Sequence, residues 1–321
     1  MATKRQVFPY AADTSGYVLA LKDSGKSTQA KEKASKVGHI VSLIITYAFL
    51  VFMGVLIIFP FYWMIITSLK NPSEIQFLNP TFFPKFGLYW ANYANGIERL
   101  DFWTLLKNTL IVGILSTIGT LITTILAAFA FAKLNFKGKN LMFAVLLGSM
   151  MIPGEMMVVT NFISVSRLGW LAEENDIGKF TAMIVPFWVS IFYIYLLRQN
   201  FKQVPNELYL AAKVDGKSDW SYLWKVMVPL AMPTLTTIFI LKLMGAWNSY
   251  IWPQMIVGGE HNKHLWVMTL GLRENFANAE DVTMFGAQMA ATVVVTVPLL
   301  LLFIFFRKYI MRGVGRAGIK G

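Results

Sequence analysis

Long stretches without a charged residue constrain this chain more than any other feature. No charge lies between Lys107 and Lys133 or between Asp281 and Arg307. A helix rises 1.5 Å per residue, so about 20 apolar residues cross a hydrocarbon core of about 30 Å. The sequence therefore predicts an all-α integral membrane protein with six transmembrane helices. The predicted spans cover residues 40–68, 107–133, 141–166, 180–197, 226–257 and 281–307.

Prolines mark irregular points in two of these spans. Pro60 lies late in the first span, where the missing N–H and the ring can kink a helix. The third span is interrupted by the sequence Ile152-Pro153-Gly154-Glu155. Irregular backbone at membrane depth is tolerated where it lines a cavity, so we expect Glu155 to lie beside one.

The charges indicate which membrane face each loop occupies. Only 14% of the 321 residues are charged, whereas a soluble domain averages about 25%. Most of the 29 Lys and Arg residues fall in residues 1–39, 133–139, 198–225 and 307–321, and most acids fall in the other loops. The positive-inside rule then places both termini in the cytoplasm. Because these cations flank apolar spans, the net charge of +12 does not indicate nucleic-acid binding.

The first 39 residues are polar and basic, and no apolar segment typical of a cleaved signal peptide follows the start. We expect residues 1–39 to form a cytoplasmic arm that is mostly disordered or loosely helical. The remaining predicted domains are a transmembrane domain at 40–312, with a cytoplasmic loop at 199–227, and a cytoplasmic tail at 313–321.

An amphipathic insert lies inside the predicted cytoplasmic loop, between Glu207 and Pro233. Leu208, Ala211 and Ala212 share one helical face, and the two alanines would let a partner approach closely. Gly216 stands where a helix end favours a left-handed residue. Ser218 or Asp219 can cap a second helix, and Pro229 is expected to mark its end. Such an insert predicts a docking segment that another protein binds and moves.

Catalytic motifs are missing from the sequence. It contains no Gly-rich phosphate loop of the GxxxxGK[ST] type, no HExxH and no GxSxG. With no cysteine, it has neither disulfides nor thiol ligands. His261 and His264 could hold a metal, but a solvated loop is the favoured interpretation. We therefore predict a non-enzymatic chain with no metal and no cofactor.

Two ionisable residues, Glu155 and Lys242, lie inside predicted spans. Such groups face protein or water rather than lipid, so they could line a translocation path. The simpler alternatives are a mutual ion pair or a lysine that reaches the interface.

The segment Gly245–Met255, GAWNSYIWPQM, combines aromatic rings with an amide in the fifth span. Sugar C–H faces pack on aromatic rings, and amides and hydroxyls bond sugar hydroxyls. An interfacial aromatic belt is the alternative. The candidate substrate-path residues are Glu155, Lys242, Trp247, Asn248, Tyr250 and Trp252.

The insert resembles the EAA loop of permease subunits in ABC importers, whose pattern is EAA-x3-G-x9-I-x-L-P. Leu210-Ala211-Ala212, three further residues and Gly216 match its first half, and the segment Val226–Pro229 matches its second half. Leu210 replaces the glutamate of the pattern, and Glu207 lies one turn earlier. The segments AAFAFAKLNFKGK, YLLRQNFKQVPNELYLAAKVDG and AWNSYIWP are similar to carbohydrate-uptake permeases. The final GVGRAGIKG resembles the tail of the smaller permease subunit of maltose-type importers.

This resemblance implies a type I importer permease fold in a sugar importer of the cell membrane, with cytoplasmic coupling helices. It implies four kinds of neighbour: a second permease subunit, two ATP-binding subunits, an extracytoplasmic solute-binding protein and the lipid bilayer. The implied ATPase-coupling residues are Glu207, Leu210, Ala211, Ala212, Asp215, Gly216 and Pro229. Gly318, Lys320 and Gly321 would belong to a tail that contacts the ATPase, and the loop 257–266 would meet the binding protein.

Other functions stay open at this stage. An ABC permease for a non-sugar solute, or a homodimeric one, fits the same residues. An ion-coupled secondary transporter predicts inverted repeats, and no convincing repeat is visible. A membrane-embedded enzyme would need clustered acids or histidines at one membrane face.

Overall fold

The computed structural model describes residues 14–77, 79–277 and 284–315, which contain helices and no strand. The chain divides between Trp63 and Met64 into two units, which are described separately. The α-helices are α1 Thr14–Ser68, α2 Pro72–Ile75, α3 Ala91–Leu100, α4 Phe102–Ala132, α5 Lys139–Ser149, α6 Met157–Arg167, α7 Asp176–Ile184, α8 Ile191–Gln203, α9 Asn206–Val214, α10 Asp219–Tyr222, α11 Val228–Leu230, α12 Met232–Trp247, α13 Ile251–Val257, α14 Met268–Phe276 and α15 Phe285–Gly315. Short 3-10 helices cover Gly154–Met156, Val185–Phe187 and Glu260–Leu265, and a π-helix covers Leu223–Met227.

The first unit consists, in its described part, of most of α1. Its apolar part begins near His39, and the helix passes through Pro60 without ending. The 30 residues from His39 to Ser68 would extend about 45 Å, enough to cross a bilayer. The helical backbone starts at Thr14, so it includes much of the predicted arm. Residues 1–13 lie outside the described part.

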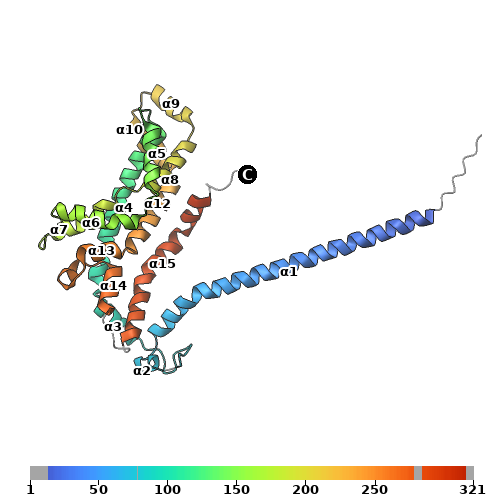
Figure 1. The fold of residues 1–321 in the computed structure, drawn as a ribbon, viewed down its shortest axis with the longest axis horizontal. Coiled ribbons are helices and arrows are strands. Elements are labelled where there is room, and N and C mark those ends of the chain that lie inside the picture. Colours follow the sequence, from blue (N-terminus) through green and yellow to red (C-terminus); the bar gives the residue numbers. More distant parts are fainter. Residues whose placement is uncertain (1–13, 78, 278–283, 316–321) are drawn as a thin grey trace, which may run out of the picture. The chain divides into compact units, whose positions relative to one another are not determined.

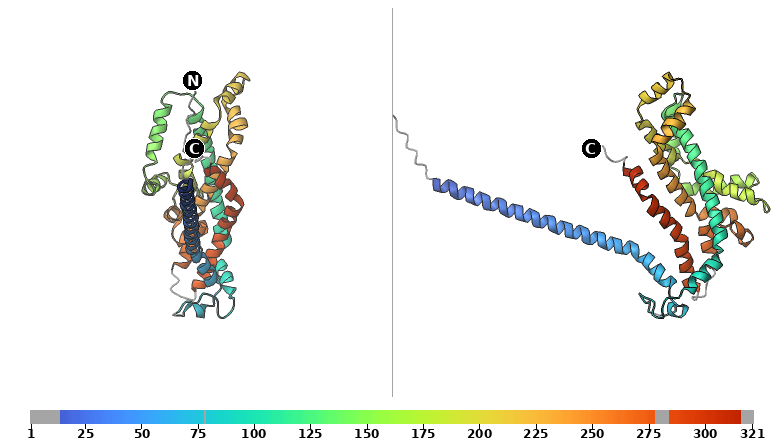
Figure 2. Two further views of the ribbon diagram at one scale, coloured as in Figure 1. Left: turned by 90° about the vertical axis from the view of Figure 1, so that its right-hand side faces the viewer. Right: turned by 180° about the vertical axis from the view of Figure 1, so that it is seen from behind.

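The second unit is organised around the long helix α4, which packs against α8 and α12 (Figure 1). Figure 2 shows α9 and α10 at one end of this unit and α3 at the other. The buried face of α4 carries small and hydroxyl-bearing residues, such as Gly113 and Thr117. Thr117 donates to the Gly113 carbonyl at 2.6 Å, so its hydroxyl needs no partner elsewhere. Small residues of this kind let helix backbones approach closely inside a membrane.

The predicted fourth span is broken rather than continuous. The chain bends by 46° between the helical segment ending at Phe187 and α8. Pro186 lies in the short helix before the break and donates no backbone hydrogen bond. Hydroxyls of α4 bond the carbonyls there: Thr120 donates to Phe187 O at 2.9 Å and Thr123 to Trp188 O at 2.5 Å. A neighbouring helix therefore stabilises a break that a charge-free run does not reveal.

The predicted fifth span is also divided. Helix α12 meets the preceding helical segment, Asp219–Leu230, at a bend of 77°. It then ends at Trp247, and α13 starts again at Ile251. The third span is interrupted where the sequence predicted it, between Ser149 and Gly154.

Among the described residues, three helices are long and apolar enough to span a membrane, and the two bent pairs raise this number to five. The pieces α5 and α6 occupy the predicted third span. The arrangement is compatible with the six predicted spans. The three single helices are His39–Ser68, Phe102–Ala132 and Phe285–Lys308.

Candidate functional sites

The loop between α8 and α12 exposes an apolar surface. Helix α9 contains no buried residue, and Leu210 and Val214 are 61% and 88% exposed. Trp220 of α10 is 62% exposed and packs edge-on against Trp224 at 5.6 Å between ring centroids. Large apolar side chains gathered on a polar loop indicate a surface that a partner covers.

The helices α9 and α10 are locked to each other through a defined turn. Gly216 has φ +69°, its N–H donates to Lys213 O at 3.0 Å, and the Lys217 N–H donates to Ala212 O at 2.9 Å. These two bonds form the Schellman motif that a left-handed glycine permits. Ser218 then caps α10 by accepting from the Ser221 N–H at 3.2 Å. The predicted helix–glycine–helix arrangement is present.

Side chains reinforce this turn. The Tyr209 hydroxyl donates to Asp219 Oδ1 at 2.7 Å, and Lys213 Nζ lies 2.9 Å from the same oxygen. The hydrogen bond to Asp219 raises the pKa of Lys213. The Tyr209 ring also meets the Tyr222 ring edge-on at 5.2 Å. Two helices from one loop are thereby held as a single rigid unit.

Two connections join this unit to the helix bundle. Tyr222, Leu223 and Met227 are buried in an apolar cluster with residues of α4, α8 and α12. Lys133, at the end of α4, donates to Val204 O at 2.7 Å and to Asn206 Oδ1 at 2.9 Å. Burial lowers the pKa of Lys133, and the Glu207 carboxylate opposes that shift. A displacement of α9 and α10 would therefore reach α4 directly.

The predicted coupling residues occupy this loop in different ways. Glu207, Leu210 and Ala211 are exposed on α9, and Ala212 is half-buried against the apolar cluster. Pro229 lies inside the short helix α11, and the bend follows it, near Ala231. Sequence reasoning missed Trp220 and Trp224, although their i, i+4 spacing in a polar loop was a usable signal. Asp215 and Gly216 are also exposed.

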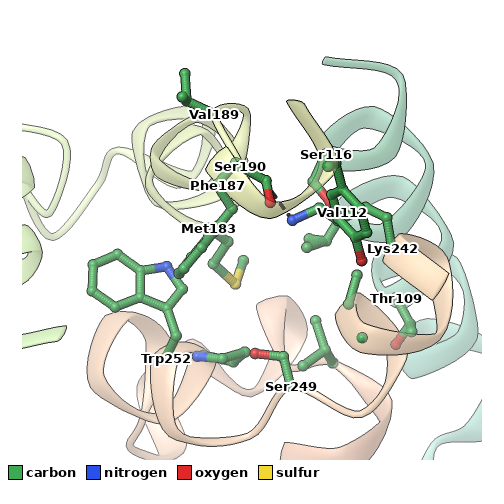
Figure 3. A pocket seen from close by; sticks show the side chains of 15 residues that line it. Thr109, Val112, Ser116, Met183, Phe187, Val189, Ser190, Lys242, Ser249 and Trp252 are labelled. Carbon is green, nitrogen blue, oxygen red and sulfur yellow. Dashed lines mark hydrogen bonds between the residues drawn. The ribbon is translucent and has the colours of Figure 1, made fainter. Parts of the chain in front are cut away.

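A second candidate site is a cavity of about 360 Å³ among α4, α7, α8 and α12 (Figure 3). Trp252 and Ser249 lie across it from Ser116 and Lys242. The Lys242 ammonium donates to Phe187 O at 3.2 Å and lies 5.5 Å from the Phe187 ring centroid. The lining residues are Thr109, Val112, Ser116, Met183, Phe187, Val189, Ser190, Tyr193, Lys242, Gly245, Ala246, Ser249, Trp252, Pro253 and Val267.

The structure brings two of the predicted path residues to this cavity, Lys242 and Trp252. Trp252 is 4% exposed, and its indole N–H donates to Ala182 O at 3.0 Å. Trp247 packs in the core, and Asn248 is exposed just beyond the end of α12.

The other two predicted path residues are placed differently. Tyr250 is half-buried, with the Arg273 guanidinium 4.7 Å from its ring centroid. The backbone of Glu155 lies in the 3-10 helix Gly154–Met156, and its side chain lies outside the described part, as do Gly318, Lys320 and Gly321.

The loop 257–266 folds against the bundle. Asn108 of α4 donates to the carbonyls of His264 and Trp266 at 2.8 and 2.9 Å. A ring nitrogen of His264 lies 2.9 Å from Asp176 Oδ2. Lys179 donates to Asn262 at 2.9 Å. Within the described ranges, no three His, Cys, Asp or Glu residues are grouped as a metal site requires.

Comparison with known proteins defines the class of this protein. Residues 18–316 match the family described as "Binding-protein-dependent transport system inner membrane component". The match covers most of the chain, so the protein belongs to this family. It is a membrane-bound permease subunit of an ABC importer, and the predicted family is confirmed. Permeases of this family are non-catalytic and act with a separate ATPase and a solute-binding protein.

Three individual proteins similar to this chain are permeases of saccharide transport systems. It is 28% identical over 281 residues to the arabinooligosaccharides transport system permease protein AraQ of Bacillus subtilis, covering 85% of this chain and 94% of that protein. It is also 28% identical to the diacetylchitobiose uptake system permease protein NgcG of Streptomyces coelicolor, covering 85% and 87%. The trehalose/maltose transport system permease protein MalG of Thermococcus litoralis is likewise 28% identical, with 84% and 94% covered.

A solved structure shares the fold. It is described as a bacterial ABC transporter involved in the import of the acidic polysaccharide alginate, and one of its chains matches with a TM-score of 0.71 at 23% identity. The match covers 83% of this chain and 95% of that chain. The likeness supports the importer-permease fold predicted from the sequence.

Proposed function

We propose that this chain forms half of the membrane pathway of a sugar importer, with an oligosaccharide as the transported molecule. The names of three similar permeases each specify a saccharide. The cavity beside α4 offers the matching chemistry, with the rings of Phe187 and Trp252 and the hydroxyls of Ser190 and Ser249. Rings pack on sugar C–H faces, and hydroxyls exchange hydrogen bonds with sugar hydroxyls.

The proposed assembly contains a second, different permease subunit that completes the pathway. Two ATP-binding subunits dock on the cytoplasmic side, and an extracytoplasmic binding protein delivers the sugar. Both termini of this chain lie in the cytoplasm, in agreement with its excess of Lys and Arg in residues 1–39, 133–139, 198–225 and 307–321. The tail with Gly318, Lys320 and Gly321 contacts the ATP-binding subunits.

The α9–α10 unit is the proposed coupling element, and the observation that carries this assignment is its exposed apolar surface. Leu210 and Val214 project from a helix with no buried residue. Leu210 replaces the glutamate of the EAA pattern, so an apolar contact takes the place of a polar one there. When ATP closes the nucleotide-binding dimer, the rigid unit moves as one body and transmits the displacement to α4 through Lys133.

Co-purification with the neighbouring subunits tests the assignment. The purified complex is reconstituted in vesicles with its binding protein, and ATP hydrolysis is measured against a panel of oligosaccharides. We expect one oligosaccharide class to stimulate hydrolysis and to accumulate in the vesicles. Stimulation by an amino acid or peptide, with none by saccharides, would refute the sugar assignment.

Site-specific crosslinking tests the coupling element separately. A cysteine at Ala211 should capture an ATP-binding subunit, because this residue is exposed on α9. A cysteine at Ala172 serves as the matched control, because this alanine is also exposed but lies in the loop between α6 and α7. Capture at Ala172 and none at Ala211 would contradict the proposed coupling surface.

A further inference from the structure

A cavity of about 440 Å³ lies where the turn between α4 and α5 meets the end of α8. Three of its lining residues are cations, Lys139, Arg198 and Lys202, and no lining residue is a carboxylate. The neutral lining residues are Asn135, Phe136, Gly138, Asn140 and Leu141. A concave site with three positive charges and no acid favours an anionic ligand.

Arg198 is fixed in place within this site. Its side chain is 6% exposed, and its Nε–H donates to Phe131 O at 3.0 Å. The guanidinium carbon lies 3.7 Å from the centroid of the Phe143 ring. Stacking and a backbone bond therefore hold the guanidinium plane before any ligand arrives. A fixed guanidinium is well suited to bidentate recognition of a phosphate group.

The first turn of α5 adds backbone donors to the same cavity. Gly138 precedes α5 with φ +78°, and no side chain caps this helix end. Asn140 and Leu141, the second and third residues of the helix, line the cavity. Uncapped N–H groups at a helix start carry partial positive charge and bind anions, phosphates in particular.

The cations also repel one another in the described structure. Lys139 donates to Leu134 O at 2.7 Å, which keeps its ammonium in the turn. Burial lowers the pKa of Lys139, and the charges of Arg198, Lys202 and Lys133 lower it further. A bound anion would offset this repulsion.

An exposed apolar face adjoins the cavity on α5. Leu141, Met142 and Val145 are 71%, 53% and 65% exposed. Phe136, which lines the cavity, is 39% exposed. In a membrane protein, such a face meets lipid acyl chains, so a headgroup in the cavity would have its chains along α5.

We propose that this cavity binds the phosphate group of an anionic phospholipid, held by Arg198, Lys202 and the start of α5. The site is separate from the translocation cavity and does not depend on the transported solute. The proposal requires only that the chain lies in a membrane, which its family membership shows.

Native mass spectrometry of the full chain in detergent tests the site. Delipidated protein is titrated with phosphatidylglycerol, with zwitterionic phosphatidylcholine and with inorganic phosphate. We expect phosphatidylglycerol to bind at least about fivefold more tightly than phosphatidylcholine, since a single cation near an anionic membrane surface already contributes about this factor. Occupancy by inorganic phosphate that phosphatidylglycerol does not displace would overturn the lipid assignment.

Two variants from the same region separate a defined site from diffuse surface charge. Lys202→Gln should weaken phosphatidylglycerol binding about fivefold. Lys137→Gln removes an equal charge from the turn between α4 and α5, at a residue that does not line the cavity, and it should change binding much less. Equal losses in the two variants would refute the site. Because Arg198 is buried, Arg198→Gln is compared with Arg198→Lys at matched thermal stability, and a larger loss of lipid affinity is expected in Arg198→Gln, which lacks the charge.

Discussion

Substitution of Gly216 gives a direct test of the proposal that ATP-binding subunits displace α9 and α10 as one rigid unit. The Gly216 φ of +69° lies in the left-handed region, and no atom beyond the adjoining residues lies within 4 Å of the position that a Cβ would take. A Gly216→Val substitution therefore strains the backbone without creating a clash. The left-handed conformation costs an ordinary residue about 1–2 kcal/mol, and a β-branched residue more. This energy corresponds to a factor of about 5–30 in the population of the native turn.

Gly216→Val should weaken the coupling between ATP hydrolysis and transport rather than prevent folding. Helix α9 has no fully buried side chain, so loosening it should leave the apolar core of the helix bundle intact. Losing the Schellman turn would let α9 and α10 move independently, so a displacement of α9 would no longer carry Tyr222 and the apolar cluster with it, and only the Lys133 bonds would still join α9 to α4. We expect Gly216→Val to assemble with its partner subunits but to transport less substrate for each ATP hydrolysed.

The assay compares substrate uptake and ATP hydrolysis in the same reconstituted vesicles. Gly216→Asn is the matched control, because asparagine adopts the left-handed conformation more readily than other side chains, and it should retain most of the coupling. Uptake per ATP that is unchanged in Gly216→Val would show that rigidity of this turn is not required.

Four further substitutions give distinct expected outcomes. Met227→Ala removes a fully buried side chain and should cost about 2–5 kcal/mol of stability. Leu210→Ala, on the exposed α9, should change stability by no more than about 0.5 kcal/mol yet weaken binding of the ATP-binding subunit. Thermal unfolding measures the stability and a pull-down measures the binding, and the reverse pattern would contradict the assignment. Lys242→Met removes the bond to Phe187 O and should raise the KM of uptake more than it lowers kcat, and a change in kcat alone would argue against a substrate contact. Gly96→Ala places a Cβ 2.7 Å from the Ala287 carbonyl oxygen, so it should cost about 1–3 kcal/mol, and an unchanged melting temperature would refute this close approach of α3 and α15.

The turn between α9 and α10 could be predicted from local sequence because its geometry is local. A glycine at a helix end, followed by a serine that caps the next helix, specifies a turn through bonds within a few residues. The attachment of this loop to the bundle could not be predicted in the same way. Lys133 lies 71 residues before Val204, and nothing in the sequence between them indicates that the two meet.

The candidate substrate path was predicted only in part, for a related reason. Trp247, Asn248, Tyr250 and Trp252 are neighbours in sequence, and a continuous helix was expected to carry them. The helix ends at Trp247, so Trp247 packs in the core while Trp252 reaches the cavity wall.

The sequence by itself determined that this protein lies in a membrane, because charge-free runs long enough to span hydrocarbon have a large cost in water and none in lipid. It also determined the helix–glycine–helix turn, because φ preferences and caps act over a few residues. Only the tertiary structure decided that the fourth span breaks after Phe187, since Thr120 and Lys242 from other helices bond the Phe187 carbonyl at the break. The tertiary structure likewise assembled both cavities, because their polar groups come from segments far apart in sequence and meet only when the helices pack.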